Sequence, residues 1–462
     1  WALEGAAVVW MGVRQNRLLA RIFGTLLQFA AGFSLLTDYH YHAAPLAILN
    51  SIYIGGVLVS FAGLFSAWYM QLNQASLKQF ETSLANALFA WGVLWWLGSG
   101  LREIDRFVPN QYSFSAILLL LALGSFAFSL LRQRLTWPVA RIPALGLLPA
   151  LWLIAYVQWF DAMHPFAGTA WAGWLLAFAL LYRILRREEN ALSAAHTRYF
   201  HMGALWLFTL LAAKEAPWAI NYMVEGQGTW PLIAWAVMPG LILGALSLRG
   251  QQLRWPVAAH LHTYLGSAAV PLAVFIGLWS LFSNLGSDGN PYPLSYLPLL
   301  NPLDLAQIFV FLVLASWLLK IRQLEIPILD QIPREARYAA IAIPLFVWLN
   351  AALLRTLHYW ADVPFNMHSM MHSVLVQASI SIFWSVLAMG LMRYAALKQI
   401  RPLWMAGGAL MGAVVLKLFT TDISGIGSLE RIVSFIGVAL LMLIIGYIAP
   451  LPTKKREESK HA

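Results

Sequence analysis

Apolar stretches of about 17–23 residues recur along the whole chain, and a helix of that length crosses the ~30 Å hydrocarbon core of a membrane. The chain of 462 residues is 60% hydrophobic, only 11% charged, and has a mean hydropathy of +0.68. Soluble domains carry about a quarter charged residues. The pattern therefore predicts an all-α, polytopic membrane protein and excludes a soluble one.

The spacing of these stretches predicts a bundle of about fifteen spans, starting with a partial helix from Trp1 to about Val13. The other spans are centred near residues 28, 60, 91, 123, 151, 177, 208, 240, 271, 312, 347, 384, 411 and 440. Residues 1–450 thus form a transmembrane domain, and residues 451–462 form a polar tail. Many of the 22 Trp and 16 Tyr lie near the span ends, where their rings favour the headgroup level.

The segments between the spans alternate in charge. One set is basic, with residues such as Arg132 and Arg186, and the other holds acids such as Asp304 and Asp362. About 24 of the 30 Lys and Arg fall in the first set, and loops rich in these residues stay in the cytoplasm. We therefore expect a cytoplasmic C-terminal tail. The net charge of +10 then reflects topology and contact with anionic lipid headgroups, and not binding of nucleic acid.

The spans pair into repeated two-helix hairpins with a period of about 55–72 residues. In each hairpin the first helix ends in a basic or amide-rich turn, and the second returns to an outer polar residue. These outer ends lie near Thr37, Arg102, Gln158, Lys214, Asn284, Arg355 and Lys417. Repeated units of this kind stack on their neighbours, and in transporters the sites lie at repeat interfaces. An ordinary up-and-down bundle gives a similar spacing and is the alternative.

Ionisable residues near the outer ends are candidate binding residues, because a charge within a span is costly. The candidates are Glu4, Lys214, Arg355, Lys417, Asp422 and Arg431. If the hairpins pack around a common axis, the cations could converge on a phosphate or an anionic headgroup. Two alternatives need no ligand: each long cation extends to the interface by itself, or Glu4 and Asp422 pair with the cations in a structural girdle.

A second group of polar residues is rich in histidine. His358, Asp362, His368 and His372 lie within fifteen residues. His368 and His372 are four apart and share one helix face, a spacing that suits a divalent metal with His358, Asp362 or His42 as a third ligand. Because no glutamate sits between the histidines as in zinc proteases, the pattern favours no metal.

Motifs of soluble enzymes are missing from the sequence. There is no cysteine, which excludes disulfides, thiolate metal sites and cysteine nucleophiles. No phosphate-binding loop and no dinucleotide fingerprint occur, so no cofactor can be named. The longest outer loop, about Asn284 to Pro302, is either a lid over an outer cavity or an ordered turn.

Motifs at both ends of the chain resemble a known family. They are Trp1-Ala-Leu-Glu-Gly5 with Val8-Val-Trp-Met-Gly-Val-Arg14, Gln377 to Trp384, Leu416 to Asp422, Glu430-Arg431-Ile-Val-Ser-Phe and Gly446-Tyr447, with a looser match at Arg355-Thr-Leu-His358. The chain resembles the bacterial membrane proteins grouped as domain of unknown function 2339. The resemblance implies a multi-pass protein of the bacterial inner membrane with no established activity.

The resemblance also bears on the candidate residues and on the start of the chain. It points again to Glu4, Lys417, Asp422 and Arg431. Members of the family often carry an additional N-terminal portion. Because this chain begins at Trp1 without an initiator Met, we expect such a portion or a partner chain in the complete protein.

Three functions stay open at the level of sequence. The first is transport, flipping or binding of an anionic lipid or envelope glycan at the outer leaflet, with membrane lipids as partners. The second is a membrane-embedded transferase acting on the periplasmic side, with Asp38 or Asp362 as base and His358 assisting. The third is a structural scaffold of an envelope complex. The sequence leaves it undecided whether the protein is an enzyme.

Overall fold

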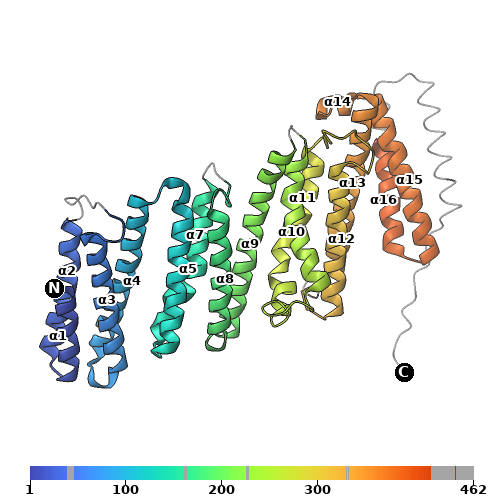
Figure 1. Ribbon diagram of the computed structural model, residues 1–462. Coiled ribbons are helices and arrows are strands. Elements are labelled where there is room, and N and C mark those ends of the chain that lie inside the picture. Colours follow the sequence, from blue (N-terminus) through green and yellow to red (C-terminus); the bar gives the residue numbers. More distant parts are fainter. Residues whose placement is uncertain are drawn as a thin grey trace, which may run out of the picture. The chain divides into compact units, whose positions relative to one another are not determined.

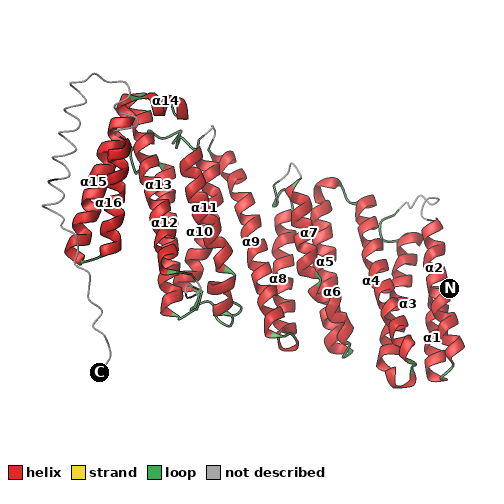
Figure 2. Ribbon diagram, turned by 180° about the vertical axis from the view of Figure 1, so that it is seen from behind, coloured by secondary structure: helices red, strands yellow, loops and turns green. Residues whose placement is uncertain are grey.

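The computed structural model describes residues 1–38, 46–160, 164–224, 228–328, 330, 332–417 and 443. Helices dominate this part of the chain, and it contains no strand (Figures 1 and 2). The α-helices are α1 (Ala2–Arg14), α2 (Leu18–Asp38), α3 (Ser51–Leu72), α4 (Gln79–Phe107), α5 (Asn110–Arg134), α6 (Arg141–Leu145), α7 (Leu147–Trp159), α8 (Ala170–Glu188), α9 (Ala194–Met223), α10 (Trp230–Arg249), α11 (Ala269–Gly286), α12 (Pro302–Gln323), α13 (Arg334–Ala361), α14 (Met367–His372), α15 (Val374–Lys398) and α16 (Arg401–Lys417). Shorter turns are η1 (Gln74–Ser76), η2 (Pro138–Ala140), η3 (Glu189–Ala191) and η4 (Thr263–Ser267).

The helices agree with the hydropathy pattern. A helix lies at every predicted span position from the first partial span to the one centred near residue 411, whereas the last, near residue 440, falls outside the described residues. Among the described helices, ten are long and apolar enough to cross a membrane by length and composition. The all-helical prediction is confirmed. The predicted count of fifteen spans is larger than these ten helices and is not confirmed.

The chain divides into two compact units, and each is described by itself. Unit 1 comprises Trp1–Met223, Ala234–Ile276 and Phe311–Gln331. In this unit α1 packs on α2, α3 on α4, and α5 on α8. Small residues permit the closest approach: a Cβ atom on Gly24 of α2 would lie 2.6 Å from the carbonyl oxygen of Gly5 in α1.

Two ion pairs with buried carboxylates join helices of unit 1. Arg21 of α2 donates from Nη2 to Oε2 of Glu81 in α4 at 3.0 Å, and both side chains are buried. Arg132 of α5 lies 2.8 Å from the carboxylate of buried Glu188 in α8, which also accepts from Ser129 Oγ at 2.9 Å. A buried charge is tolerated when it is paired and hydrogen-bonded. These pairs therefore fix how α2 meets α4 and how α5 meets α8.

The segment before α11 contains a break in the helix. Gly266 of η4 has non-helical torsion angles, φ −91° and ψ −109°. Two indoles donate to carbonyl oxygens beside the break: Trp206 Nε1 to Ala268 O and Trp317 Nε1 to Leu265 O, each at 2.9 Å. Buried carbonyl groups need a hydrogen-bond donor. The indoles of α9 and α12 are the donors that the broken helix does not provide.

Unit 2 comprises Val224–Ile233, Gly277–Val310 and Ile332–Ala462. It contains the end of α11, the start of α12, and α13 to α16, with α15 packed on α16. The connection between α11 and α12, residues 287–301, is anchored by its own backbone. Asn290 O accepts from Thr229 N and Oγ1, both at 3.0 Å, and Tyr292 O accepts from the Trp230 indole at 2.8 Å. The segment is thus an ordered turn.

Candidate functional site

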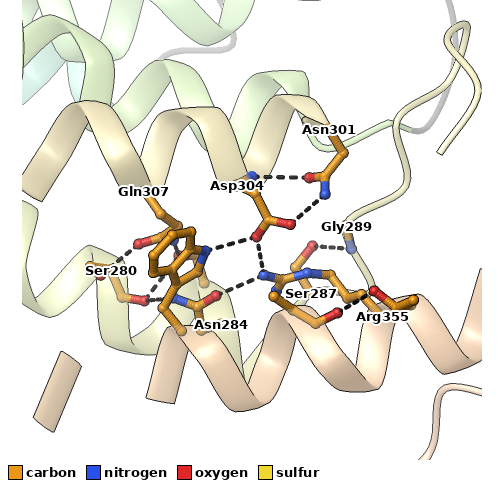
Figure 3. Close-up of polar contacts among 12 residues, drawn as sticks. Ser280, Asn284, Ser287, Gly289, Asn301, Asp304, Gln307 and Arg355 are labelled. Carbon is orange, nitrogen blue, oxygen red and sulfur yellow. Dashed lines mark hydrogen bonds and ion pairs between the residues drawn. The ribbon is translucent and has the colours of Figure 1, made fainter. Parts of the chain in front are cut away.

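A buried charge pair links the end of α11, the start of α12 and α13 (Figure 3). Arg355 of α13 and Asp304 of α12 are both 0% exposed, and they form an ion pair through Arg355 Nη2 and Asp304 Oδ1. The same Nη2 atom donates to Asn284 Oδ1 of α11 at 3.1 Å. One guanidinium therefore holds three helices together.

The start of α12 places Asp304. Asn301 Oδ1 accepts from the Asp304 backbone N–H at 2.9 Å, and Asn301 Nδ2 donates to Asp304 Oδ2. Pro302 is the first residue of the helix, where its missing N–H is not needed. A carboxylate in the first turn also suits the positive end of the helix dipole. The Trp348 indole donates to Asp304 Oδ1 at 2.9 Å, so the carboxylate is surrounded by donors.

A belt of uncharged polar side chains continues from this pair along α11 and α12. Ser280 Oγ donates to Gln307 Oε1 at 2.6 Å, and Gln307 Nε2 donates to Ser283 Oγ at 2.8 Å. Asn284 Nδ2 donates to Ser280 O at 2.7 Å. All four residues are buried, and Figure 3 shows the belt beside the ion pair. Such a connected network is expensive to bury unless each member finds a partner.

The segment 287–301 closes over Arg355. Gly289 has φ +74°, and a Cβ atom there would lie 2.5 Å from Arg355 Cδ, so only glycine fits this approach. Arg355 Nε and Nη1 are buried and have no hydrogen-bond partner among the described residues. Tyr296 is 9% exposed in the same segment, and its burial raises the pKa of its phenol. The phenol is therefore uncharged at neutral pH.

A pocket of about 520 Å³ adjoins this cluster in unit 2. Its wall is largely apolar and includes Phe346, Leu354 and Met370, with the amides of Asn284, Asn350 and Asn366 between them. The first two amides are held by other side chains: Asn284 by Arg355, and Asn350 by the Trp384 indole at 2.7 Å. Small-molecule sites combine such apolar walls with a few fixed polar groups. The charge of Arg355 is already balanced by Asp304, so the wall suits an apolar chain.

The predicted binding cations Lys214 and Lys417 each contact a neighbouring helix. Lys214 Nζ donates to Gln158 O at 2.7 Å and Trp159 O at 3.0 Å, the last carbonyls of α7, and lies 5.1 Å from the Trp159 ring. A cation at a helix C-terminus is favourable. Lys417 Nζ donates to Gln377 O at 3.0 Å and Ser381 Oγ at 2.9 Å of α15.

The remaining predicted binding residues are Glu4, Asp422 and Arg431. Glu4 is exposed, and its carboxylate lies 3.4 Å from the Trp1 amino nitrogen. Asp422 and Arg431 lie outside the described residues.

No hydrogen bond joins His358 and Asp362, two of the predicted acid–base residues. His358 Nδ1 lies 2.7 Å from Val363 O, and exposed Asp362 ends α13 in a left-handed conformation, φ 52°. Asp38 is the last residue of α2. A carboxylate–imidazole contact occurs instead in unit 1, where Glu215 Oε1 lies 2.7 Å from His164 Nδ1.

The paired histidines of α14 lie together, as their spacing predicts. The rings of His368 and His372 are 4.3 Å apart, and His372 Nδ1 contacts His368 O at 2.8 Å. His42 lies outside the described residues. Within the described chain, no three His, Asp or Glu residues are grouped so that they could hold a metal ion.

Sequence reasoning missed the buried acids that pair with cations. Glu81 and Glu188 lie in segments that the charge pattern marks as basic, and Asp304 was only one of several outer acids. The available signal was an acid among basic residues, because an isolated acid in such a segment tends to have a local partner.

These helices and their buried polar clusters define a multi-pass, all-helical membrane protein. The chain belongs to the family of predicted membrane proteins DUF2339, which matches residues 1–452. The resemblance at the two chain ends therefore extends through the middle. No curated protein and no solved structure matches the chain.

Proposed function

We propose that this protein binds a membrane amphiphile by its apolar chain in the unit 2 pocket, as a step in moving or presenting a lipid or lipid-linked glycan. The observation that carries the proposal is the apolar pocket of about 520 Å³, whose polar wall residue Asn284 is fixed by buried Arg355. Fixed walls favour binding because little freedom is lost when the ligand enters. Arg355 acts here by positioning Asn284.

We also propose the bacterial inner membrane as the location, with the C-terminal tail in the cytoplasm. The basic segments support this orientation, because most Lys and Arg fall on the side of the tail. The pocket then belongs to the outer half of unit 2, since it adjoins the ends of α11 and α13 that carry Asn284 and Arg355.

The finer architecture that we propose is a set of tandem hairpins with an internal repeat. The motif Trp-Pro-Val-Ala occurs at 137–140 and again at 255–258. In both places the indole donates to a side chain 66 residues earlier, Trp137 to Gln71 and Trp255 to Glu189. Recurrence of both a motif and its contact supports true repetition over an ordinary bundle.

A pocket-filling variant tests the binding function. Gly286 lines the pocket, and a Cβ atom there meets no atom within 4 Å, so Gly286→Leu adds a side chain to open space. Gly277→Leu on the same helix is the matched control, because a Cβ atom there is equally unobstructed and Gly277 is not a pocket residue.

Both variants are purified in nanodiscs made from native membrane, and the retained lipids are quantified by mass spectrometry. We expect the amount of one retained amphiphile to fall at least tenfold in Gly286→Leu. A loss of about 1.4 kcal/mol in binding free energy lowers the affinity tenfold. Gly277→Leu should keep it. Equal lipid content in both variants and the wild type would exclude binding in this pocket.

A scaffold is the second candidate, and one observation favours it. Lys214 donates to a backbone carbonyl of α7, and Lys417 donates to a backbone carbonyl of α15. Arg355 pairs with Asp304. Charges used in this way hold helices together and need no ligand. Unchanged lipid content in the test above would leave this function as the better one.

A further inference from the structure

A cluster of titratable side chains lies in unit 1, apart from the pocket. Glu189 of η3 is in ion-pair contact with His260 Nε2 and accepts from the Trp255 indole at 3.0 Å. The His260 ring lies 4.3 Å from the ring of His201 in α9, which is 1% exposed. The cluster therefore joins η3, α9 and the segment 250–262 between α10 and α11.

The cluster extends inward through two tyrosines. His201 Nδ1 lies 3.0 Å from Tyr264 Oη of η4, and the ring of Tyr182 in α8 lies 6.4 Å from the His201 ring. His201 Nε2 is buried and has no hydrogen-bond partner among the residues of the described ranges. A buried imidazole with one unused nitrogen is an unsatisfied group that the fold retains at a cost.

The equivalent contact at the first Trp-Pro-Val-Ala motif, residues 137–140, is made without titratable groups. Trp137 of the first Trp-Pro-Val-Ala motif donates to Gln71, and Gln71 Nε2 donates to Asn86 Oδ1 of α4 at 2.9 Å. Gln71 stands where the second motif has Glu189. Neutral amides thus serve as the structural tie in one copy, whereas the other copy carries a carboxylate and two imidazoles.

Charged and titratable groups of α8 and η4 also lie around the cluster. Arg186 of α8 lies over the Trp255 ring at 5.6 Å, and Glu188 is already paired with Arg132. Tyr182 and Tyr264 contribute uncharged phenols. Glu189 is therefore the carboxylate that can balance a charged imidazole in this cluster.

We propose that Glu189, His201 and His260 form a proton-binding site whose occupancy controls the attachment of the segment 250–262. One proton on His260 balances Glu189 and strengthens their contact. A second proton, on His201, places two cations about 4 Å apart against one carboxylate. Repulsion between unit charges at that distance changes an equilibrium by roughly several hundredfold near a protein surface. The second proton therefore weakens the attachment of the segment 250–262 to α9.

Hydrogen–deuterium exchange of the full chain in lipid nanodiscs tests this site. Exchange is measured at about pH 7.5 and about pH 4, because a repulsion of several hundredfold moves binding of the second proton about 2.5 pH units below the usual titration of histidine, with times scaled for the intrinsic exchange rate. We expect the wild-type segment 250–262 to lose at least tenfold of its protection in acid. Residues 135–141, beside the amide network, are the internal control and should keep theirs.

Two variants make the test specific. Glu189→Gln with His201→Asn replaces the carboxylate and the inner imidazole by neutral amides, the kind of group that Gln71 and Asn86 supply at the first motif, and it should hold the segment at both pH values. His262→Asn changes an exposed histidine of the same segment and should respond like the wild type. If the double variant is unprotected at neutral pH, His260→Asn replaces it and should likewise not respond to acid. An equal protection of wild-type 250–262 at both pH values, or an acid response that survives these changes, would overturn the proposal.

Discussion

Removal of the charge of Asp304 should destabilise unit 2 strongly. Asp304→Asn keeps the size of the side chain and an oxygen that can accept from Trp348 or Arg355. What it removes is the negative charge opposite a guanidinium that is 0% exposed. An uncompensated buried charge costs about 3–5 kcal/mol in the free energy of unfolding.

A second substitution separates charge from packing. Arg355→Met removes the buried cation but keeps much of its length. In the double variant with Asp304→Asn no buried charge is left, so it should be more stable than Asp304→Asn alone. Lys398→Met, at an exposed end of α15, is the control for loss of a surface charge and should cost less than ~1 kcal/mol.

The assay is titration with sodium dodecyl sulfate of the protein in bicelles, followed by circular dichroism. Exchange of the amides in 277–310 shows whether the loss lies in unit 2. A cost for Asp304→Asn no larger than that of Lys398→Met would refute the reasoning. So would a double variant less stable than Asp304→Asn.

Two further predictions concern single contacts and use the same titration. Glu81→Gln leaves buried Arg21 without its carboxylate and should lower the free energy of unfolding by about 3–5 kcal/mol. Glu335→Gln at an exposed position should lower it little. Equal losses in the two variants would contradict a stabilising pair. Gly289→Ala forces a methyl group toward Arg355 at a positive φ and should lower the free energy of unfolding by about 1–3 kcal/mol. Gly277→Ala should be neutral or stabilising. A neutral Gly289→Ala would show that the segment 287–301 adjusts its backbone at little cost.

The positions of the helices could be predicted because hydropathy is local. A run of apolar residues long enough to span a membrane carries its own signal, whatever it packs against. Helices α8 and α9 were found in this way, although neither is among the ten that qualify as spans by length and composition. The basic residues near the end of α8, such as Arg183 and Arg186, dilute its apolar window.

The partners in the buried clusters could not be predicted in the same way. Arg355 stands out in the sequence as a cation within a span, and its acid, Asp304, lies 51 residues away. The sequence offered Glu4 and Asp422 as partners and not Asp304, because any acid on the outer side satisfies the charge pattern. Selection among them depends on how α11, α12 and α13 pack, which only the tertiary structure shows. The same limit hid Glu81, whose partner Arg21 lies 60 residues away.

The break at Gly266 has a mechanical consequence. Its two flanking carbonyls are bonded to indoles from different helices, Trp206 of α9 and Trp317 of α12. Straightening η4 would therefore break one bond to each helix at the same time. A displacement of α9 against α12 would therefore stretch at least one of the two bonds, so the break ties these two helices to each other.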